Sequence, residues 1–562
     1  MTLAMIPESA PFDNRQRAWL NGFFAALLNA PAGGPVDGNA VNGAVNGHAS
    51  APALLEEESF PWHDPALPID ERLALAVERP LERKLMSCMA QLNCGACGYL
   101  CQSYGEAIAR GEEKDLTRCT PGGADTAKML KKLMAEPREP AAAKESANGA
   151  VNGTVNGAAH AAINGHAPAV NGHKPAAPAV AGPAMAGPAM AGTSRQNPLT
   201  AVLVENRRLT HPDAPKDTRH VVIDFGDSDL AYEAGDSLGI LPMNCPQLVD
   251  ETLQALGATG AESVAVGDGR RKSLRQALAG EFQLTKCRPA LWELLAEHAA
   301  GDLREELKIA ASGDDEFAAT ADVADALQKY PTCRLPLEAF IGALGKLQPR
   351  LYSISSSQRK HPGQVHLTVG VVQFESLGKR RHGVASHYIG VRSRPGEAVR
   401  VFVQKSRFRL PAADDTPVIM VGPGTGIAPF RAFLEEREAR GAKGKNWLVF
   451  GNQYIDYDFL YRDELDAWCD IDLITRLDLA FSRDGAKKVY VQDRLQENAG
   501  ELWDWLEAGA HFYICGDAKR MAVDVEATLR KVIVERGGLD EAGAKKYLAD
   551  MQKAGRYQKD VY

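Results

Sequence analysis

Two stretches of this chain are too poor in large apolar residues to form a folded core, and they divide the sequence into separate pieces. Residues 31–53 and 141–196 consist mainly of Ala, Gly, Asn and Pro, with repeated VNG units and a duplicated AGPAM. Such segments bury too little surface to offset the entropy of ordering a chain. We therefore predict two flexible linkers, and several domains around them, because single cores stop growing at roughly 250–300 residues.

Charge and hydropathy exclude several classes of protein. The net charge of −8 argues against a nucleic-acid binder, which would carry a basic face. No apolar run approaches the roughly 18 residues of a membrane span, and the N-terminus lacks the pattern of a secretion signal. We expect a cytoplasmic protein that binds neither nucleic acid nor membrane. Within residues 1–30, apolar residues at helical spacing predict a short amphipathic helix.

A cluster of cysteines lies between the two linkers. Cys94, Cys97 and Cys101 follow one another closely, and Cys119 comes later, two residues before a proline. In a reducing compartment such a cluster indicates metal or redox chemistry rather than disulfides. Three close thiolates and one remote thiolate are typical of an iron–sulfur site. We predict that residues 54–140 form a small helical domain holding a 4Fe-4S cluster on these four cysteines.

Other interpretations of the cysteines stay open. Zinc is the structural alternative, although zinc sites commonly pair two CxxC knuckles and only one is present here. Structural or redox-active thiols are a third interpretation. Cys88 is a spare ligand candidate, but a position packed within a helix explains it better.

The C-terminal part, residues 412–562, alternates apolar strands with helices. This alternation predicts a parallel sheet with helices on both faces. The strand VIMVG runs into a turn containing Gly424 and Thr425 and then into a helix, an arrangement that admits a pyrophosphate at the helix N-terminus. Further on, Arg483 and Lys488 suit a 2′-phosphate and Tyr490 can stack on adenine, so NADPH is favoured over NADH.

The preceding region combines strands with a helical stretch. Strand patterns fill residues 197–245 and 348–411, whereas residues 246–347 have helical spacing. In the segment RLYS, Arg350 suits a flavin pyrophosphate, Tyr352 can cover a ring, and the Ser353 hydroxyl can reach the flavin edge.

Seven motifs in fixed order resemble one family. They are RLYS, TVGVV, GVAS, GPGTGIAPFRAF, SRDGAKKVYVQ, YICGDAKRM and the terminal RYQKDVY. Over residues 197–562 the chain resembles the diflavin reductases, which include the flavoprotein subunit of sulfite reductase. The resemblance implies a multidomain α/β and β-barrel protein: a ferredoxin–NADP-reductase-like FAD barrel, a helical connecting domain at 246–347 and a doubly wound NADPH domain.

The resemblance also implies roles for individual residues. FAD would be held by Arg350, Leu351, Tyr352, Ser353, Thr368, Val369, Gly370, Gly383, Val384, Ala385 and Ser386. Beside Gly424 and Thr425 of the turn, NADPH would be held by Ser482, Arg483, Lys488, Val489, Tyr490, Val491, Gln492 and Asp524. Ser353, Cys515 and Asp560 would surround the atoms between which hydride moves. Tyr562 would stack on the flavin and swing aside for nicotinamide, and a tyrosine here resembles the sulfite reductase branch.

One expected module has no counterpart in the sequence. Diflavin reductases carry a flavodoxin-like domain, but no threonine-rich phosphate loop precedes the reductase region here. Our hypothesis is that the 4Fe-4S cluster replaces FMN and relays single electrons from FAD to a haemoprotein, with sulfite reductase as the partner that the resemblance suggests. The long linker would let the small domain move between FAD and partner.

Two other functions stay open. In one, the protein reduces a separate flavodoxin or ferredoxin, and the cysteine domain is a zinc-binding or docking module. In the other, the protein is a redox sensor whose cluster controls partner binding.

Overall fold

The computed structural model describes residues 62, 68–91, 97, 99–119, 121–135, 191–267 and 269–562. These all belong to the second of two compact units, Ser59–Tyr562; the first is Met1–Glu58. The predicted N-terminal helix, the first linker, most of the second linker and Cys94 lie outside the described residues. None of the helices described is long and apolar enough to cross a membrane.

In the described part of the cysteine domain the chain forms four helices. They are α2 (Ile69–Leu75), α3 (Leu81–Ser87), α4 (Cys101–Ala109) and α5 (Gly123–Ala135). Leu85, Tyr104 and Leu130 are fully buried at the centre of this domain. Helices α3 and α4 cross closely because residue 105 is glycine: a Cβ there would lie 2.6 Å from the carbonyl oxygen of Glu82.

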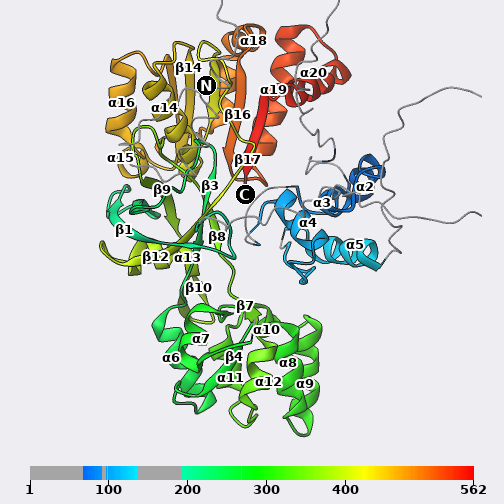
Figure 1. Cartoon of the computed structure of the whole chain (residues 1–562). Coiled ribbons are helices and arrows are strands. Elements are labelled where there is room, and N and C mark those ends of the chain that lie inside the picture. Colours follow the sequence, from blue (N-terminus) through cyan, green and yellow to red (C-terminus); the bar gives the residue numbers. More distant parts are fainter. Residues whose placement is uncertain are drawn as a thin grey trace, which may run out of the picture. The chain divides into compact units, whose positions relative to one another are not determined.

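A six-stranded antiparallel sheet opens the reductase region (Figure 1). Its strands are β1 (Leu199–Arg208), β2 (Asp217–Asp224), β3 (Ser237–Leu241), β8 (Arg350–Ser353), β9 (Gln364–Val371) and β12 (Ala398–Gln404), in the order β8-β3-β12-β1-β2-β9. Alternate residues point into one apolar core, as in Leu203, Val221 and Val401. The edge strands meet at a single bridge between Ile354 and Leu367, so the sheet curls round on itself.

Short elements follow β9. The hairpin of β10 (Gln373–Ser376) and β11 (Lys379–His382) leads into helix α13 (Val384–His387) and a π-helical turn at Tyr388–Arg392. These elements place the segment Gly383–Ser386 beside the strand that carries Thr368.

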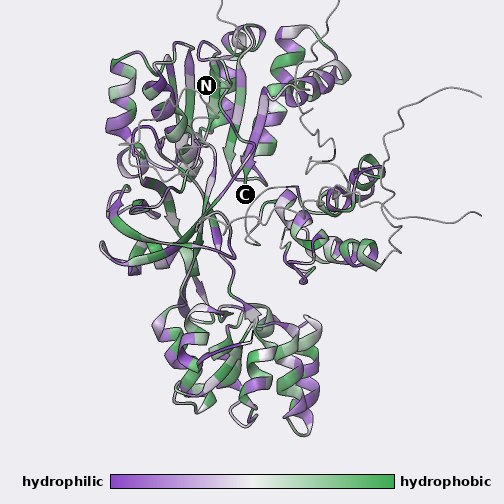
Figure 2. Ribbon diagram, viewed as in Figure 1, coloured by the Kyte–Doolittle hydropathy of each residue, from purple (hydrophilic) through white to green (hydrophobic). Residues whose placement is uncertain are grey.

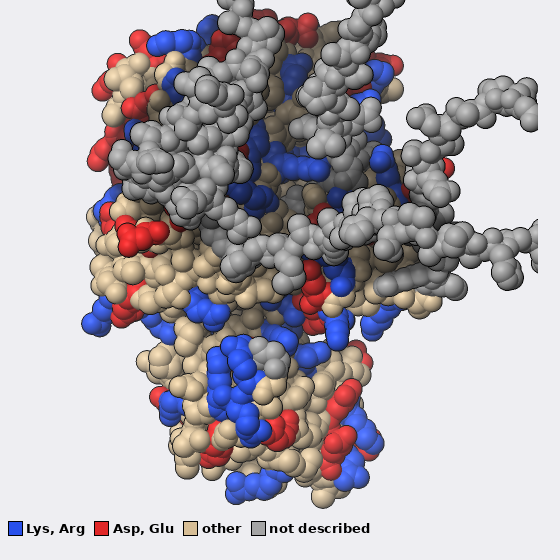
Figure 3. Space-filling model, in the orientation of Figure 1, with Lys and Arg blue, Asp and Glu red and all other residues tan. Residues whose placement is uncertain are grey.

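A helical insert separates β3 from β8. It contains α6 (Pro246–Leu256), α7 (Leu274–Gly280), α8 (Pro289–Glu297), α9 (Asp302–Ser312), α10 (Glu316–Thr320), α11 (Val323–Lys329) and α12 (Leu337–Ala343). Two small antiparallel pairs accompany them: β4 (Ser263–Val266) with β5 (Arg270–Ser273), and β6 (Phe282–Gln283) with β7 (Gly345–Lys346). Lys379 of β11 binds Asp325 of α11 at 2.8 Å, and Arg381 pairs with both Asp322 and Asp325, which ties the insert to the sheet. Lys and Arg side chains gather over part of the insert in Figure 3, so the net negative charge is not spread evenly.

The C-terminal part forms the parallel sheet that the strand–helix alternation predicted. Its strands are β13 (Val418–Val421), β14 (Asn446–Asn452), β15 (Arg476–Phe481), β16 (His511–Gly516) and β17 (Tyr557–Val561), in the order β15-β14-β13-β16-β17. The central strands are predominantly hydrophobic in Figure 2, as expected for strands buried on both faces.

Helices cover both faces of this sheet. Alternate strand residues enter two different cores, so that Ile419 and Phe512 face one and Met420 and Tyr513 face the other. The first core includes α17 (Val491–Glu497), α18 (Ala499–Glu507), α19 (Met521–Gly537) and α20 (Glu541–Lys553). The second includes α14 (Ala428–Arg440) and α16 (Arg462–Asp470), and the short α15 (Ile455–Asp458) lies before α16. After β13 the chain moves to β14 on one side, whereas β16 pairs on the other, which leaves a crevice at the carboxyl end of β13.

Candidate active site

A cavity of about 970 Å³ lies between the antiparallel sheet and the start of α14. Most of the residues predicted to contact FAD line it: Arg350, Leu351, Tyr352, Ser353, Thr368, Gly370, Gly383, Val384, Ala385 and Ser386. The turn residues Gly424 and Thr425 and the C-terminal Asp560 and Tyr562 complete the wall. Segments from Arg208 to Tyr562 thus converge on this cavity. Its size and its mixed polar and apolar lining are those expected of a cofactor site.

Three of the four predicted catalytic residues form one hydrogen-bonded group. The parallel register of β16 and β17 sets Cys515 opposite Asp560. The Ser353 hydroxyl, at the end of β8, donates to Asp560 Oδ2 at 2.6 Å, and the Cys515 thiol lies 3.8 Å from the same oxygen. The group therefore joins the flavin-side sheet to the parallel sheet.

Burial changes the acidity of this group. Burial raises the pKa of the Cys515 thiol well above its usual range, and the neighbouring Asp560 raises it further. Burial also raises the pKa of Asp560, although the hydrogen bonds from Ser353 and Cys515 oppose this change. At neutral pH Cys515 is consequently a neutral thiol that can donate to the carboxyl group.

The C-terminal tyrosine closes one side of the cavity. Tyr562 N donates to the Gly516 carbonyl at 3.0 Å, and its hydroxyl lies 2.8 Å from Thr425 Oγ1. The residue is nevertheless 41% exposed. A ring held by its backbone and by one side-chain hydrogen bond can move without disturbing the sheet.

The turn after β13 requires glycine. Gly424 has φ +57°, and a Cβ on Gly426 would lie 2.2 Å from the Cys515 carbonyl oxygen. The turn can therefore lie directly against β16, next to the Ser353–Asp560–Cys515 group. The N-terminus of α14 follows and supplies backbone N–H groups and a positive dipole end.

The residues predicted for the 2′-phosphate lie outside this cavity, at the carboxyl edge of the parallel sheet. Ser482 directly follows β15, and its backbone N–H donates to the Asn452 carbonyl at 3.0 Å. Arg483 and Lys488 are exposed and form no ion pair with the residues that the structure describes. Tyr490, 44% exposed, precedes α17, and Gln492 Nε2 lies 3.4 Å from Asp524 Oδ2.

Other predicted residues have buried side chains. Val369 lies in the core of the antiparallel sheet and Val491 in a core of the parallel sheet, so only their backbones can face a cofactor. Val489 packs partly against that second core. Cofactor contact by these residues stays a prediction.

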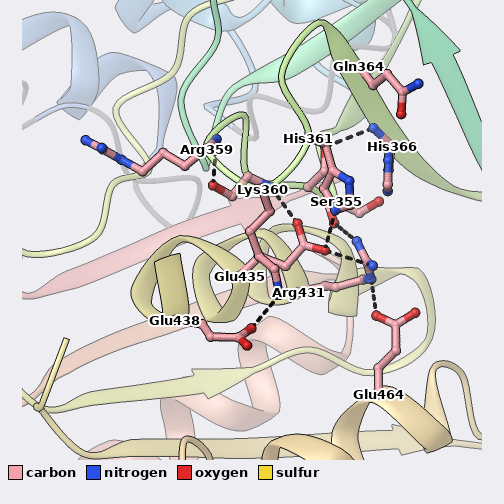
Figure 4. Close-up of polar contacts among 12 residues, drawn as sticks. Ser355, Arg359, Lys360, His361, Gln364, His366, Arg431, Glu435, Glu438 and Glu464 are labelled. Atoms are coloured by element: carbon pink, nitrogen blue, oxygen red, sulfur yellow. Dashed lines mark hydrogen bonds and ion pairs between the residues drawn. The ribbon is translucent and has the colours of Figure 1, made fainter. Parts of the chain in front are cut away.

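Helix α14 is joined to the segment after β8 by a polar network that the motifs did not predict (Figure 4). Arg431, only 7% exposed, donates to the Ser355 carbonyl at 2.6 Å and pairs with Glu435 at 2.9 Å and Glu464 at 2.7 Å. Glu435, 3% exposed, accepts from Ser357 N at 2.7 Å and lies 3.0 Å from His361 Nε2. Each buried charge is thus paired and hydrogen-bonded, as burial requires.

The network connects the two sides of the cavity. The helix that begins at the glycine turn is fixed to the chain two to eight residues beyond Ser353. Outside the network's centre, Lys360 binds Glu438 at 2.6 Å and Arg359 binds Glu436 at 2.8 Å. The run of polar and basic residues SSSQRKH after RLYS was the available signal, but it does not identify its partners.

The cysteine domain gathers three of the predicted ligands. Cys97, Cys101 and Cys119 are buried in one core, while Cys94 lies outside the described residues. Among the residues described, no three His, Cys, Asp or Glu side chains are arranged to hold a metal ion. A Cβ on Gly122 would lie 3.0 Å from Cys119 Sγ, so glycine leaves room at that sulfur. The fourth ligand and the cluster stay predictions.

Cys88 has the surroundings of a structural thiol. It follows α3, is fully buried and donates to the Lys84 carbonyl at 3.3 Å. Burial raises its pKa to about 11, which opposes the thiolate form that metals require.

Three family descriptions match the sequence. Residues 191–388 match "FAD binding domain" and residues 420–527 match "Oxidoreductase NAD-binding domain". The chain contains the FAD-binding and NAD-binding domains of an oxidoreductase. Residues 89–121 match "Putative Fe-S cluster", a range that includes the four predicted ligands and excludes Cys88.

The reductase region has close relatives. The sulfite reductase (NADPH) flavoprotein alpha-component of Klebsiella pneumoniae is 46% identical over 374 residues, or 66% of this chain and 61% of the relative. The Cronobacter sakazakii protein of the same name shows the same identity and coverage, and that of Vibrio vulnificus is 44% identical over 372 residues, 66% of this chain and 60% of the relative. The chain therefore spans about 61% of the length of these curated relatives.

Proposed function

We propose that this protein is an NADPH-dependent reductase that takes hydride onto FAD and passes the electrons singly, through a 4Fe-4S cluster, to a haemoprotein. The observation that carries the hydride step is the Ser353–Asp560–Cys515 group inside the cavity shared by the two sheets. In this proposal the reductase region is a ferredoxin–NADP-reductase-like FAD barrel joined to a doubly wound NADPH domain.

The residues around the cavity fit both cofactors. Arg350 and the backbone of Gly383–Ser386 suit a flavin pyrophosphate, and Tyr352 and Tyr562 supply ring faces. Gly424–Ile427 and the start of α14 suit the NADPH pyrophosphate, and the exposed Arg483 and Lys488 suit its 2′-phosphate. When bound, FAD would supply the chemistry that accepts a hydride from NADPH together with one proton and returns the two electrons one at a time.

The protein's own groups position and polarise the reacting atoms. Asp560 accepts from Ser353 and Cys515, so two donors hold its carboxylate at the end of the cavity. A negative charge there stabilises the positive charge that develops on nicotinamide as hydride leaves. The neutral thiol of Cys515 holds the carboxylate without adding a second charge.

Two observations support the relay. The "Putative Fe-S cluster" match covers the four cysteines, and the structure buries three of them in one core. The relatives are named for sulfite reductase, which supports a sulfite reductase haemoprotein as the acceptor. The part of each relative that this chain does not match, about two fifths of its length, leaves room for a different relay module in those proteins.

Anaerobic purification tests the proposal. We expect a brown protein with about four irons per FAD, and NADPH should bleach both the flavin and the cluster. Zinc in place of iron would refute the relay and leave the cysteine domain a docking module. The relay would also fail if Cys97→Ala still reduced the native haemoprotein at the full rate.

A further inference from the structure

Among the residues that the structure describes, hydrogen bonds and a cation–π contact join the cysteine domain to the reductase. The Arg195 guanidinium carbon lies 4.6 Å from the centre of the Tyr99 ring, within the range of a cation–π contact. Arg195 Nη2 also donates to Gln348 Oε1 at 3.3 Å, and Arg118 Nη1 donates to the same oxygen. We call Tyr99, Arg118, Arg195 and Gln348 the docking contact.

The two residues from the cysteine domain are held rigidly. Arg118 pairs with Glu113 at 2.8 Å, and both side chains are less than 10% exposed. The Tyr99 hydroxyl donates to the same carboxylate at 3.2 Å, and its ring stacks on Tyr104 with centroids 5.4 Å apart. One buried carboxylate therefore fixes both contact residues before they meet the reductase, which lowers the entropy cost of docking.

The two residues from the reductase are equally well anchored. Arg195 lies in a turn that is fastened to β12, since Val403 N donates to the Gly192 carbonyl at 2.8 Å. Gln348 lines the flavin cavity two residues before Arg350, and its Nε2 donates to the Lys346 carbonyl at 2.8 Å. The docking contact thus ends at the rim of the flavin cavity.

On the other side, the docking contact adjoins the predicted cluster ligands. Tyr99 lies in the sequence between Cys97 and Cys101, and Arg118 directly precedes Cys119. All three of these cysteines belong to the core that also contains Tyr99. The part of the cysteine domain that faces the flavin cavity is therefore the part that carries its thiols.

The chemistry of the contact suits reversible binding. Two guanidinium groups, those of Arg118 and Arg195, share one neutral oxygen of Gln348. Asp115 of the cysteine domain is also attracted by the positive charge of Arg288 in the reductase. Burial would raise the pKa of Asp115, but hydrogen bonds from Thr117 and the charges of Arg118 and Arg288 lower it overall. Contacts of this kind hold a domain weakly enough for release.

We propose that the docking contact is the surface on which the cysteine domain receives electrons from the flavin. This inference rests on the proposed function. Each docking event passes one electron from reduced FAD to the oxidised cluster, so one NADPH, which supplies two electrons, supports two such events. Between the two events the cysteine domain leaves the docking contact to deliver its electron.

Arg195→Ala in the full-length holoprotein tests the proposal, because Arg195 makes two of the contacts and does not line the flavin cavity. In anaerobic stopped-flow mixing with NADPH, flavin reduction should keep its rate, while cluster bleaching should slow roughly tenfold. Arg195→Lys keeps a cation over Tyr99 and should give an intermediate rate. Arg207→Ala, an exposed arginine of β1 paired locally with Glu205, is the matched control and should bleach like the wild type.

Hydrogen exchange supplies a second readout that does not depend on the cluster. Backbone amides between Tyr99 and Cys119 should exchange faster in Arg195→Ala than in the wild type or Arg207→Ala. Unchanged exchange together with unchanged bleaching would overturn the docking contact. A protein without iron would instead refute the relay, while the exchange measurement would still decide whether the two domains dock here.

Discussion

The hydride site and the cysteine site are built in different ways. At the hydride site, the register of β16 and β17 and the strand end of β8 bring Cys515, Asp560 and Ser353 together. Of the three cysteines described at the other site, Cys97 and Cys119 belong to connections between helices, whereas Cys101 begins a helix. Strand register fixes side chains without a cofactor, whereas loop ligands commonly obtain their geometry from the metal itself.

This difference predicts how far the structure of each site depends on its bound cofactor. The hydride site should keep its architecture without FAD, because its groups already make their hydrogen bonds. The cysteine site should depend on its cluster, because the free energy of metal binding is also folding free energy for such domains. Variants in one region should therefore leave the other intact.

The largest expected effect comes from the cysteine site. Cys97→Ala should remove the iron entirely and lower the thermal stability of the cysteine domain, because an incomplete ligand set cannot hold a cube. Iron per chain and visible absorption measure the loss, and flavin reduction by NADPH is the internal control. Cys88→Ala is the matched variant: full iron content there is expected, and its loss would make Cys88 a ligand.

The next largest effect comes from the hydride site. Asp560→Asn keeps the volume but removes the charge, so flavin reduction at saturating NADPH should slow by roughly 10²-fold. The pKa of Asp560 is raised, so this carboxylate is protonated at a higher pH than an ordinary one. The rate of flavin reduction in the wild type should therefore fall as the pH is lowered through that higher range, and Asp560→Asn should lose this pH dependence. A primary isotope effect with 4-deuterated NADPH identifies the step. Wild-type rates in Asp560→Asn would exclude a role for the charge.

The sequence predicted the contents of the two sites better than their connections. Ser353, Asp560 and Thr425 occur in motifs, and strand–helix alternation sets where the strands that carry them must end. The partners of Arg431 could not be predicted, because contacts between segments about 75 residues apart leave no local pattern. Val369 shows a second limit: membership of a motif does not reveal whether a side chain faces a cofactor or the core.

Cofactor choice gives a smaller, graded effect. Arg483→Ala and Lys488→Ala together should raise KM for NADPH by roughly 10²-fold with little change for NADH, because each removes a charge-assisted contact to the 2′-phosphate. Steady-state reduction of a dye with each nucleotide measures the ratio. Lys487→Ala, a neighbouring exposed lysine, is the control. An unchanged preference for NADPH would place the 2′-phosphate elsewhere.

The smallest effect concerns the joint between the two sheets, by which we mean the contact of His220 with Tyr461 and with its neighbour His366. Burial lowers the pKa of His220 to about 3 and that of His366 to about 2, and the nearby Arg431 contributes to both changes. The folded protein therefore keeps both rings neutral, whereas the unfolded chain binds protons below about pH 6.5. The contribution of these rings to the free energy of unfolding is fully present above that pH. It should fall by up to about 1.4 kcal/mol per histidine for each pH unit below it.

Urea unfolding between pH 7 and pH 5 measures this slope, with fluorescence and flavin release followed together. His366→Gln removes one titrating ring and should reduce the slope, whereas His211→Gln, an exposed histidine, should not. An equal slope in His366→Gln would show that these rings are not kept neutral by the fold. Loss of flavin at the same pH as unfolding would link the joint to the hydride site, since Tyr461 binds His220 at 3.0 Å and Thr368 of the flavin cavity at 2.7 Å.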